Sequence, residues 1–123
     1  MKLAVAIAAD PSKGEESLGR ALNGLALASD AMRHGDEVEV LFIGTGTRWP
    51  AELSRLSHPG NVLYTSVRAA VAGASAGCAL VFGAAEQIKE IGLPQLTDNP
   101  LPGTPGLASL RRYLDSGWQT LVF

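Results

Sequence analysis

The chain has 123 residues, a length that fits one domain over residues 1–123, because a second hydrophobic core would be too small to be stable alone. Hydrophobic residues make up 46% and charged residues 18%, which excludes a disordered chain and favours a buried subunit interface. The net charge is -2 and the basic residues are scattered, so nucleic acid is excluded as a partner. No apolar run approaches the roughly 20 residues of a membrane span, and a single cysteine excludes an intrachain disulfide.

The first predicted element is a strand over Leu3–Ala8, a continuous apolar run typical of a strand that is covered on both faces. The same run superficially resembles a secretory signal sequence. Asp10 and Pro11 end it at a length that suits a strand better than a signal sequence. We therefore expect a buried first strand and a cytoplasmic protein.

A helix and a second strand follow. Ser12 and Glu15 have the spacing of a capping box and predict a helix that runs to about His34, with Gly35 as its C′ residue. Glu37–Ile43 then begins with alternating polarity and ends apolar, as a strand does when only one end is buried. A strand, a helix and a strand predict a βαβ unit with parallel strands and a right-handed crossover.

The remaining elements are predicted from apolar runs and from the glycines and prolines that separate them. Gly44–Thr47 and the proline-rich segment Thr97–Gly106 are predicted loops. A short fourth strand containing Pro94 would lie at an edge of the sheet, because proline cannot donate a hydrogen bond to a neighbouring strand. The predicted elements are helices over Trp49–Ser57 and Asn61–Ala72, a third strand over Ala76–Phe82, a helix over Ala84–Ile91, the fourth strand over Leu93–Leu96, a helix over Leu107–Ser116 and a last strand over Trp118–Phe123.

Candidate binding residues follow the carboxyl ends of the strands, because open parallel sheets bind ligands there. The segment Gly44–Trp49 combines freed backbone amides, a hydroxyl, a cation and an aromatic ring, which could hold an anion or a small planar ligand. The plainer alternative is that Thr47 caps a helix and Trp49 packs against the sheet, and that Lys13 belongs to a solvated helix start. The candidates are Asp10, Lys13, Gly44, Thr45, Gly46, Thr47, Arg48, Trp49, Gly83, Ala84 and Asn99.

No motif announces a reaction. Two histidines far apart, His34 and His58, with one cysteine do not form a zinc site, and no phosphate-binding loop or serine elbow is present, so we expect neither a metal nor a cofactor. Cys78 is the one candidate nucleophile. Near the start of the predicted third strand it would lie roughly 16 Å from the carboxyl ends of the strands, which favours a small buried hydrophobe over a reactive thiol. On that interpretation, Cys78→Ser would destabilise the fold by roughly 1 to 3 kcal/mol.

Three segments, together with the βαβ start, resemble the DsrE family of small sulfur-metabolism proteins (the DsrE, DsrF and DsrH type): Gly35–Val38, Gly77–Ala84 and Leu114–Phe123. The resemblance spans nearly the whole chain. It implies a three-layer α/β/α domain with a mainly parallel sheet of about five strands, assembled into homo-oligomers, usually trimers or hexamers. Some members of the family carry persulfide sulfur in sulfur-relay complexes.

The resemblance also bears on the site. The sulfur-carrying cysteine of the family lies just past the third strand, and Ala84 best matches that place, which implies no catalytic cysteine there. We therefore expect a homo-oligomer that binds a small ligand or a protein partner. Two alternatives remain: a persulfide carrier or sulfurtransferase that uses Cys78, with Arg48 or Lys13 stabilising the thiolate, and a purely structural assembly subunit.

Overall fold

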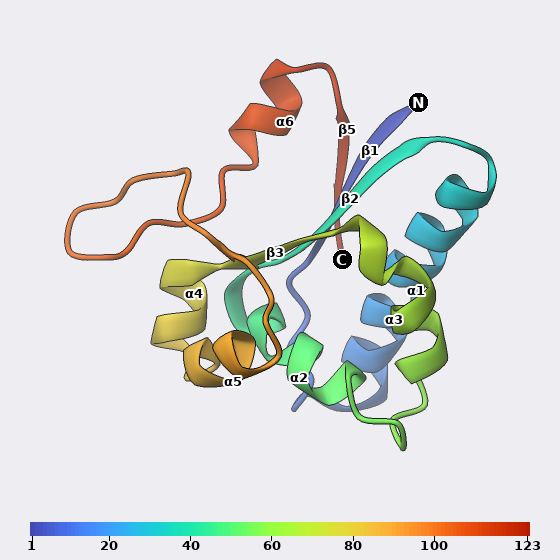
Figure 1. Ribbon diagram of the computed structural model, residues 1–123, viewed down its shortest axis with the longest axis horizontal. Coiled ribbons are helices and arrows are strands. Elements are labelled where there is room, and N and C mark those ends of the chain that lie inside the picture. The colour runs from blue at the N-terminus through green and yellow to red at the C-terminus, as the bar shows by residue number, and fades with distance from the viewer.

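The computed structural model describes all 123 residues and contains a single five-stranded sheet in which every strand pairs in parallel with its neighbours (Figure 1). The strand order is β4-β3-β2-β1-β5, so β1 lies between β2 and β5. This confirms the predicted parallel sheet of about five strands. The strands are β1 (Lys2–Ile7), β2 (Glu37–Phe42), β3 (Val71–Ser75), β4 (Gln95–Leu96) and β5 (Gln119–Val122).

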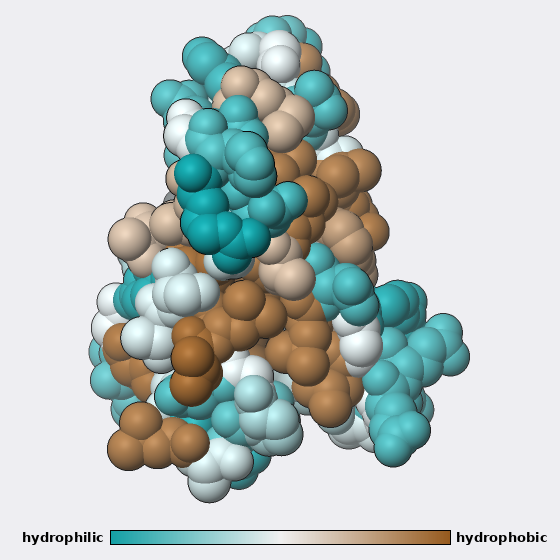
Figure 2. Space-filling view, turned by 90° about the vertical axis from the view of Figure 1, so that its right-hand side faces the viewer, coloured by the Kyte–Doolittle hydropathy of each residue, from teal (hydrophilic) through white to brown (hydrophobic).

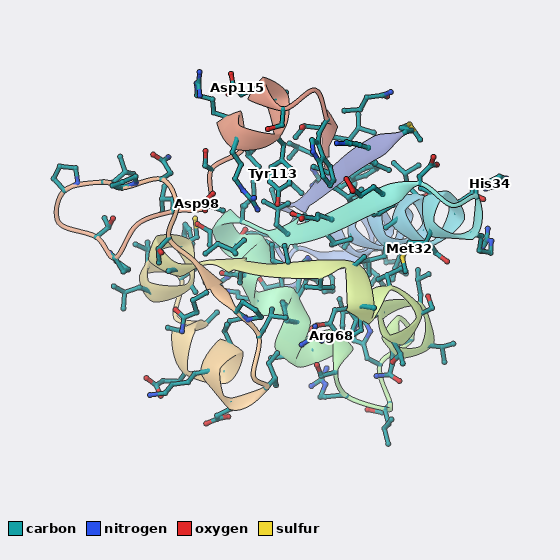
Figure 3. All side chains as sticks on the ribbon, turned by 45° about the horizontal axis from the view of Figure 1, so that its top comes forward. Met32, His34, Arg68, Asp98, Tyr113 and Asp115 are labelled. Atoms are coloured by element: carbon teal, nitrogen blue, oxygen red, sulfur yellow. The ribbon has the colours of Figure 1, made fainter.

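Helices cover both faces of the sheet. The chain passes from β1 to β4 in one direction, and right-handed crossovers place the first five helices on one face. It then reverses to reach β5, so α6 lies on the other face; Figure 3 shows Tyr113 and Asp115 of α6 on the opposite side of the sheet from Arg68. The result is a three-layer α/β/α fold. The helices are α1 (Gly14–Arg33), α2 (Trp49–Leu53), α3 (Asn61–Val67), α4 (Ala76–Val81), α5 (Ala85–Glu90) and α6 (Arg111–Asp115), with 3-10 turns η1 (Gly44–Arg48) and η2 (Arg68–Ala70).

The two faces of the sheet are covered unequally. The face under α1 to α5 forms a core of 19 buried residues, in which Val5, Phe42 and Trp49 are almost completely inaccessible to solvent. The face under α6 has a core of only 4 buried residues, namely Ala4, Ala6, Leu41 and Tyr113. Small side chains on β1 and a short helix therefore leave the second face thinly covered.

The prediction of the third strand was wrong. The strand is Val71–Ser75, a segment expected to end one helix and begin a turn, and the apolar run after it forms the helix α4 instead. The strand was missed because its residues are mostly small. Its extended conformation is stabilised by pairing: Ala74 donates to the Pro94 carbonyl oxygen, and a Cβ atom at Gly73 would overlap that oxygen. The predicted helix over Asn61–Ala72 is correspondingly short.

One predicted loop and two other helices also differ from the prediction. The predicted loop Gly44–Thr47 is part of a 3-10 turn, α2 ends at Leu53 rather than Ser57, and α6 begins at Arg111 rather than Leu107. The capping box at Ser12 does not form, because Ser12 donates to the Asp10 carboxylate instead. The edge position of β4 and the left-handed conformation of Gly35 are as predicted.

None of the helices combines the length and the apolar character that crossing a bilayer would require.

Candidate functional site

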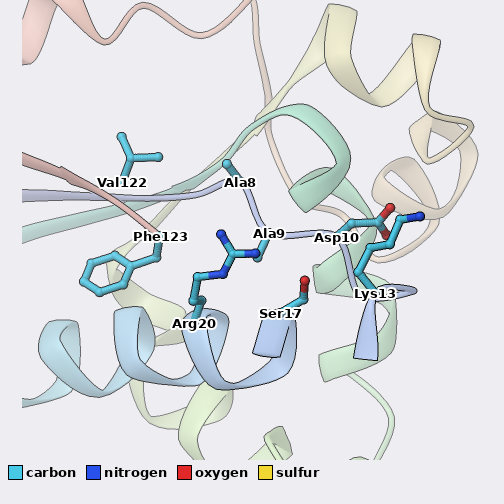
Figure 4. Close-up of a pocket in the computed structure, with 8 residues that line it drawn as sticks. All are labelled: Ala8, Ala9, Asp10, Lys13, Ser17, Arg20, Val122 and Phe123. Carbon is cyan, nitrogen blue, oxygen red and sulfur yellow. The ribbon is translucent and has the colours of Figure 1, made fainter. Parts of the chain in front are cut away.

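A cavity of about 310 Å³ opens at the carboxyl ends of β1 and β5, beside the amino end of α1 (Figure 4). Its position is the one at which parallel sheets bind ligands, where neighbouring strands continue toward opposite faces. Residues from three separate parts of the chain line it: Ala8, Ala9, Asp10, Lys13, Ser17, Arg20, Val122 and Phe123.

The turn between β1 and α1 is built around Asp10. The Asp10 carboxylate accepts hydrogen bonds from the backbone amide and the hydroxyl of Ser12, both at 2.9 Å, and the Asp10 carbonyl oxygen accepts from the amide of Lys13 at 3.1 Å. Gly14 then adopts a φ of +81°, and α1 begins without a side chain capping its first turn. The amino end of a 20-residue helix is thus left uncapped next to the cavity.

The opposite wall comes from β5. The Phe123 carbonyl oxygen accepts hydrogen bonds from the amides of Ala8 and Ala9, at 2.6 and 3.2 Å, which hold the end of β5 against the end of β1. The Phe123 ring reaches α1 at Gly24, where a Cβ atom would lie 3.0 Å from the ring. The predicted last strand is present and paired with β1, and it supplies the cavity with an apolar wall.

The charged groups of the cavity fall into two sets. The Asp10 carboxylate forms an ion pair with Arg48 at 3.2 Å. The backbone amide of Ser12, with the Ser12 hydroxyl and Arg48, holds the pKa of Asp10 below its usual value, although burial acts in the opposite direction. Lys13 and Arg20, in contrast, form no ion pair and no side-chain hydrogen bond, so the only anionic side chain of the cavity is neutralised while its two cations are free.

Arg48 lies between this cavity and a second, smaller hollow of about 230 Å³. Its Nε atom donates to the Phe82 carbonyl oxygen at 3.1 Å, and its guanidinium carbon lies 5.8 Å from the centre of the Phe82 ring. Arg48 thereby links the turn after β1 to the end of α4. The second hollow is lined by Arg48, Ala51, Glu52, Phe82, Gly83 and Gln87.

The predicted binding segment Gly44–Trp49 is largely structural. Gly46, Thr47 and Trp49 are buried, and the indole N–H of Trp49 donates to the Ala9 carbonyl oxygen at 2.7 Å. The Thr47 hydroxyl donates to the Gly44 carbonyl oxygen within the turn rather than capping a helix. Of this segment only Arg48 lines a hollow, so the alternative in which Trp49 packs against the sheet is the one observed.

The other predicted residues are divided between the two hollows and the rest of the molecule. Asp10 and Lys13 line the first cavity and Gly83 lines the second. Ala84 directly precedes α5 and is 1% exposed. It was expected just past the third strand, but α4 separates it from β3. Asn99 pairs through its backbone with Leu107, outside both hollows.

The position expected for Cys78 was also wrong. Because β3 ends at Ser75, Cys78 lies in the first turn of α4, immediately past the carboxyl end of the third strand. It is half-buried rather than fully buried. Cys78, and not Ala84, is therefore the residue that lies just past the third strand, and the destabilisation expected from a buried hydroxyl in Cys78→Ser becomes smaller.

Six cavity residues were missed by the sequence analysis: Ala8, Ala9, Ser17, Arg20, Val122 and Phe123. Ser17 and Arg20 follow Lys13 by four and seven residues, a spacing that places all three on one side of a helix. This signal was available in the sequence. The contribution of Val122 and Phe123 was not, because it depends on the pairing of β5 with β1.

No group of three or more histidine, cysteine, aspartate or glutamate side chains lies close enough together to hold a metal ion. No family model, curated protein or solved structure matches the chain. The fold and the site define an open parallel α/β protein with a ligand-sized cavity at the carboxyl ends of its central strands.

Proposed function

We propose that this chain is a DsrE-like, homo-oligomeric protein that binds a small ligand in the cavity at the ends of β1 and β5. The observation that carries the proposal is the position of the cavity. The strand order reverses beside β1, the connection that leaves β1 runs to one face, and the chain reaches β5 from the other face. Such a divergence leaves a crevice that side chains of the sheet do not fill.

The composition of the cavity also supports a ligand. Four apolar residues and four polar residues line it, which is the mixture of apolar surface and few oriented polar groups typical of small-molecule sites. The second hollow has only two apolar residues and less volume. The first cavity is therefore the better candidate.

Homo-oligomer formation is supported by the thin second face and by exposed apolar side chains. Figure 2 shows apolar side chains gathered on the face that α1 and α3 form, and a second, contiguous set lies at the end of α4. Contiguous exposed apolar surface of this kind marks interaction sites in soluble proteins. The set on α4 is Leu80, Val81 and Phe82, with exposed fractions of 61%, 72% and 36%.

The ligand proposal can be tested by screening a library of small metabolites for thermal stabilisation and mapping the hits by NMR. We expect hits to shift the signals of Ala9, Ser17 and Phe123. Ala8→Phe, which places a large side chain in the cavity, should abolish them. Ala51→Phe, which fills the second hollow, is the matched control and should leave them unchanged. A library without hits, or hits that only Ala51→Phe removes, would refute the proposal.

A second candidate function is favoured by one observation, the position of Cys78 just past β3. In this function the Cys78 thiolate attacks the outer sulfur of a donor persulfide, takes up that sulfur and releases the donor as a thiolate. Two cations were considered as partners of the thiolate. Arg48 is already bound to Asp10 and to the Phe82 carbonyl oxygen, and Lys13 lines the cavity at the ends of β1 and β5.

The sulfur-carrier function is tested by incubating the protein with a persulfide donor and measuring its mass. A gain of one sulfur atom that is absent in Cys78→Ser would replace ligand binding as the preferred function. An unchanged mass in the wild type would exclude Cys78 as a carrier. Ser75→Ala, which changes the last residue of β3, is a control for general effects of substitution at this end of the sheet.

A further inference from the structure

Two polar side chains of the cavity, Ser17 and Arg20, come from the first turns of α1, three residues apart and on one side of the helix. Lys13 immediately precedes the helix, and Figure 4 shows its side chain beside Asp10, with Ser17 between Lys13 and Arg20. None of the three forms an ion pair. The cavity therefore has unpaired cations on one wall and apolar side chains on the other. A ligand with one charged end and one apolar end would match this arrangement.

Ser17 gives the most direct sign of a ligand. Its residue is 2% exposed, its hydroxyl makes no hydrogen bond within the protein, and Figure 4 shows it directed from α1 into the space between Arg20 and Asp10. The fully buried polar side-chain atoms without a partner are Tyr64 Oη and Thr120 Oγ1, so the Ser17 oxygen still reaches the cavity. The Ser17 hydroxyl is therefore free to form a hydrogen bond with a molecule that enters the cavity.

The amino end of α1 adds a second, independent attraction for negative charge. The helix is 20 residues long, and no side chain caps its first turn. Uncapped amides at the amino end of a helix and the helix dipole together favour an anion. The acidic residues of the first turn, Glu15 and Glu16, are exposed and are not among the residues that line the cavity.

Asp10 does not oppose this attraction. Its carboxylate accepts two hydrogen bonds from Ser12 and is paired with Arg48 on the side of the second hollow. Its negative charge is therefore compensated inside the protein. Among the side chains that line the cavity, Lys13 and Arg20 are the charged ones without a partner.

The opposite wall limits the rest of the ligand. Val122 and Phe123, with Ala8 and Ala9, provide the apolar surface of the cavity, although the Phe123 ring also packs against the core at α1. If a fully polar ion bound here, this apolar surface would remain exposed to water. A ligand with a short apolar group would cover the surface, which is favourable.

Building on the ligand function proposed above, we infer that the cavity binds a small organic anion. Its charged head contacts Ser17 and Arg20, Lys13 adds positive charge at the Asp10 end of the cavity, and its short apolar body lies against Val122 and Phe123.

Calorimetric titration with matched probes tests the inference. Phenyl phosphate and benzoate carry both the charge and the apolar body, inorganic phosphate carries only the charge, and phenol carries only the body. We expect the two organic anions to bind at least about tenfold more tightly than phenol, since hydrogen bonds to charged groups are the stronger ones. We expect a similar advantage of about tenfold over inorganic phosphate, because only the organic anions cover the apolar wall. Their binding should weaken as ionic strength rises.

Variants assign the contacts. Arg20→Gln and Ser17→Ala should each weaken the binding of phenyl phosphate, by about tenfold for Arg20→Gln, because each removes a donor to the charged head. Lys89→Gln removes a cation from α5, outside the cavity, and should change the affinity by less than about twofold. Circular dichroism of each variant checks that the fold is retained.

The outcomes separate this inference from the proposed function. If phenol binds as tightly as phenyl phosphate and Ala8→Phe abolishes both, the cavity is a ligand site but not an anion site, and only the inference fails. Equal effects of Arg20→Gln and Lys89→Gln on phenyl phosphate would also overturn it. If no probe binds and the metabolite screen gives no hits, both proposals fail.

Discussion

Tyr113 organises the thin face of the sheet. Its hydroxyl donates to the Glu39 carboxylate, and the Arg112 guanidinium lies 4.3 Å from the centre of its ring while bridging Glu39 and Asp98. Burial, together with the neighbouring Glu39 carboxylate, raises the pKa of Tyr113 far above its usual value. Burial also raises the pKa of Tyr64, the other tyrosine, which packs at 4% exposure against Phe42 on the opposite face.

The two raised pKa values predict a loss of stability at alkaline pH. A group whose folded-state pKa is raised contributes stability that is present below its unfolded pKa, about 10 for tyrosine, and is lost as pH rises above that value. We expect an ultraviolet titration to show almost no tyrosinate until the near-ultraviolet circular dichroism signal is lost. Tyr113→Phe isolates Tyr64 as a control. A free tyrosine has a pKa of about 10. Ionisation of either tyrosine near that pH in the intact fold would contradict the raised pKa values.

At the scale of elements, the 3-10 turn η1 fixes how the first two strands end. Gly46 lies directly against the end of β1, where a Cβ atom would overlap the Ile7 carbonyl oxygen. Trp49 follows and bonds to the Ala9 carbonyl oxygen, and the Thr45 hydroxyl donates to the Ala8 carbonyl oxygen at 3.3 Å. These contacts position the backbone that forms the floor of the cavity, although the residues themselves do not line it.

This arrangement predicts opposite effects for two glycine substitutions. Gly46→Ala should destabilise the fold by about 3 kcal/mol, because the backbone that it meets cannot move aside cheaply. Gly19→Ala, in the middle of α1 with open space around its Cβ position, should stabilise it by about 0.5 to 1 kcal/mol, because alanine favours the helix. Urea denaturation measures both. Similar unfolding midpoints for the two variants would show that η1 does not pack against β1 in this way.

At the scale of the whole molecule, the two faces of the sheet differ in how much apolar surface they bury. The first face has 19 core residues and the second has 4. Apolar side chains also remain exposed at the end of α4 and on β5, which is an edge strand with one side unpaired. An unpaired strand edge and exposed apolar surface are features that oligomerisation covers.

We predict from these features that the protein sediments as a homo-oligomer. Sedimentation velocity should give a mass that is a multiple of 12.8 kDa, and a trimer or hexamer would agree with the DsrE resemblance. Val81→Glu, in the contiguous apolar set on α4, should shift the mass toward one chain, whereas Leu101→Glu, in the loop before α6 and outside both apolar sets, serves as the matched control. A strict monomer for the wild type would refute homo-oligomer formation and the purely structural assembly role.

The sequence by itself determined the parallel βαβ start, the edge position of β4 and the place of the last strand. Each of these features depends on a local pattern of residues. The patterns are the long apolar runs, the helix that ends at Gly35 and the proline at position 94. Asp10 and Lys13, which line the cavity, could be selected as candidates for the same reason, since both follow closely after the first strand.

Only the tertiary structure decided the third strand and the walls of the cavity. The small side chains of Val71–Ser75 have little preference for a strand, and pairing with β2 and β4 imposes the extended conformation. The position of Cys78 moved with that strand. The cavity unites the first turns of α1 with Phe123, residues that lie more than a hundred positions apart, because β5 returns to pair with β1. A contact of that kind depends on strand order, which no local pattern of residues encodes.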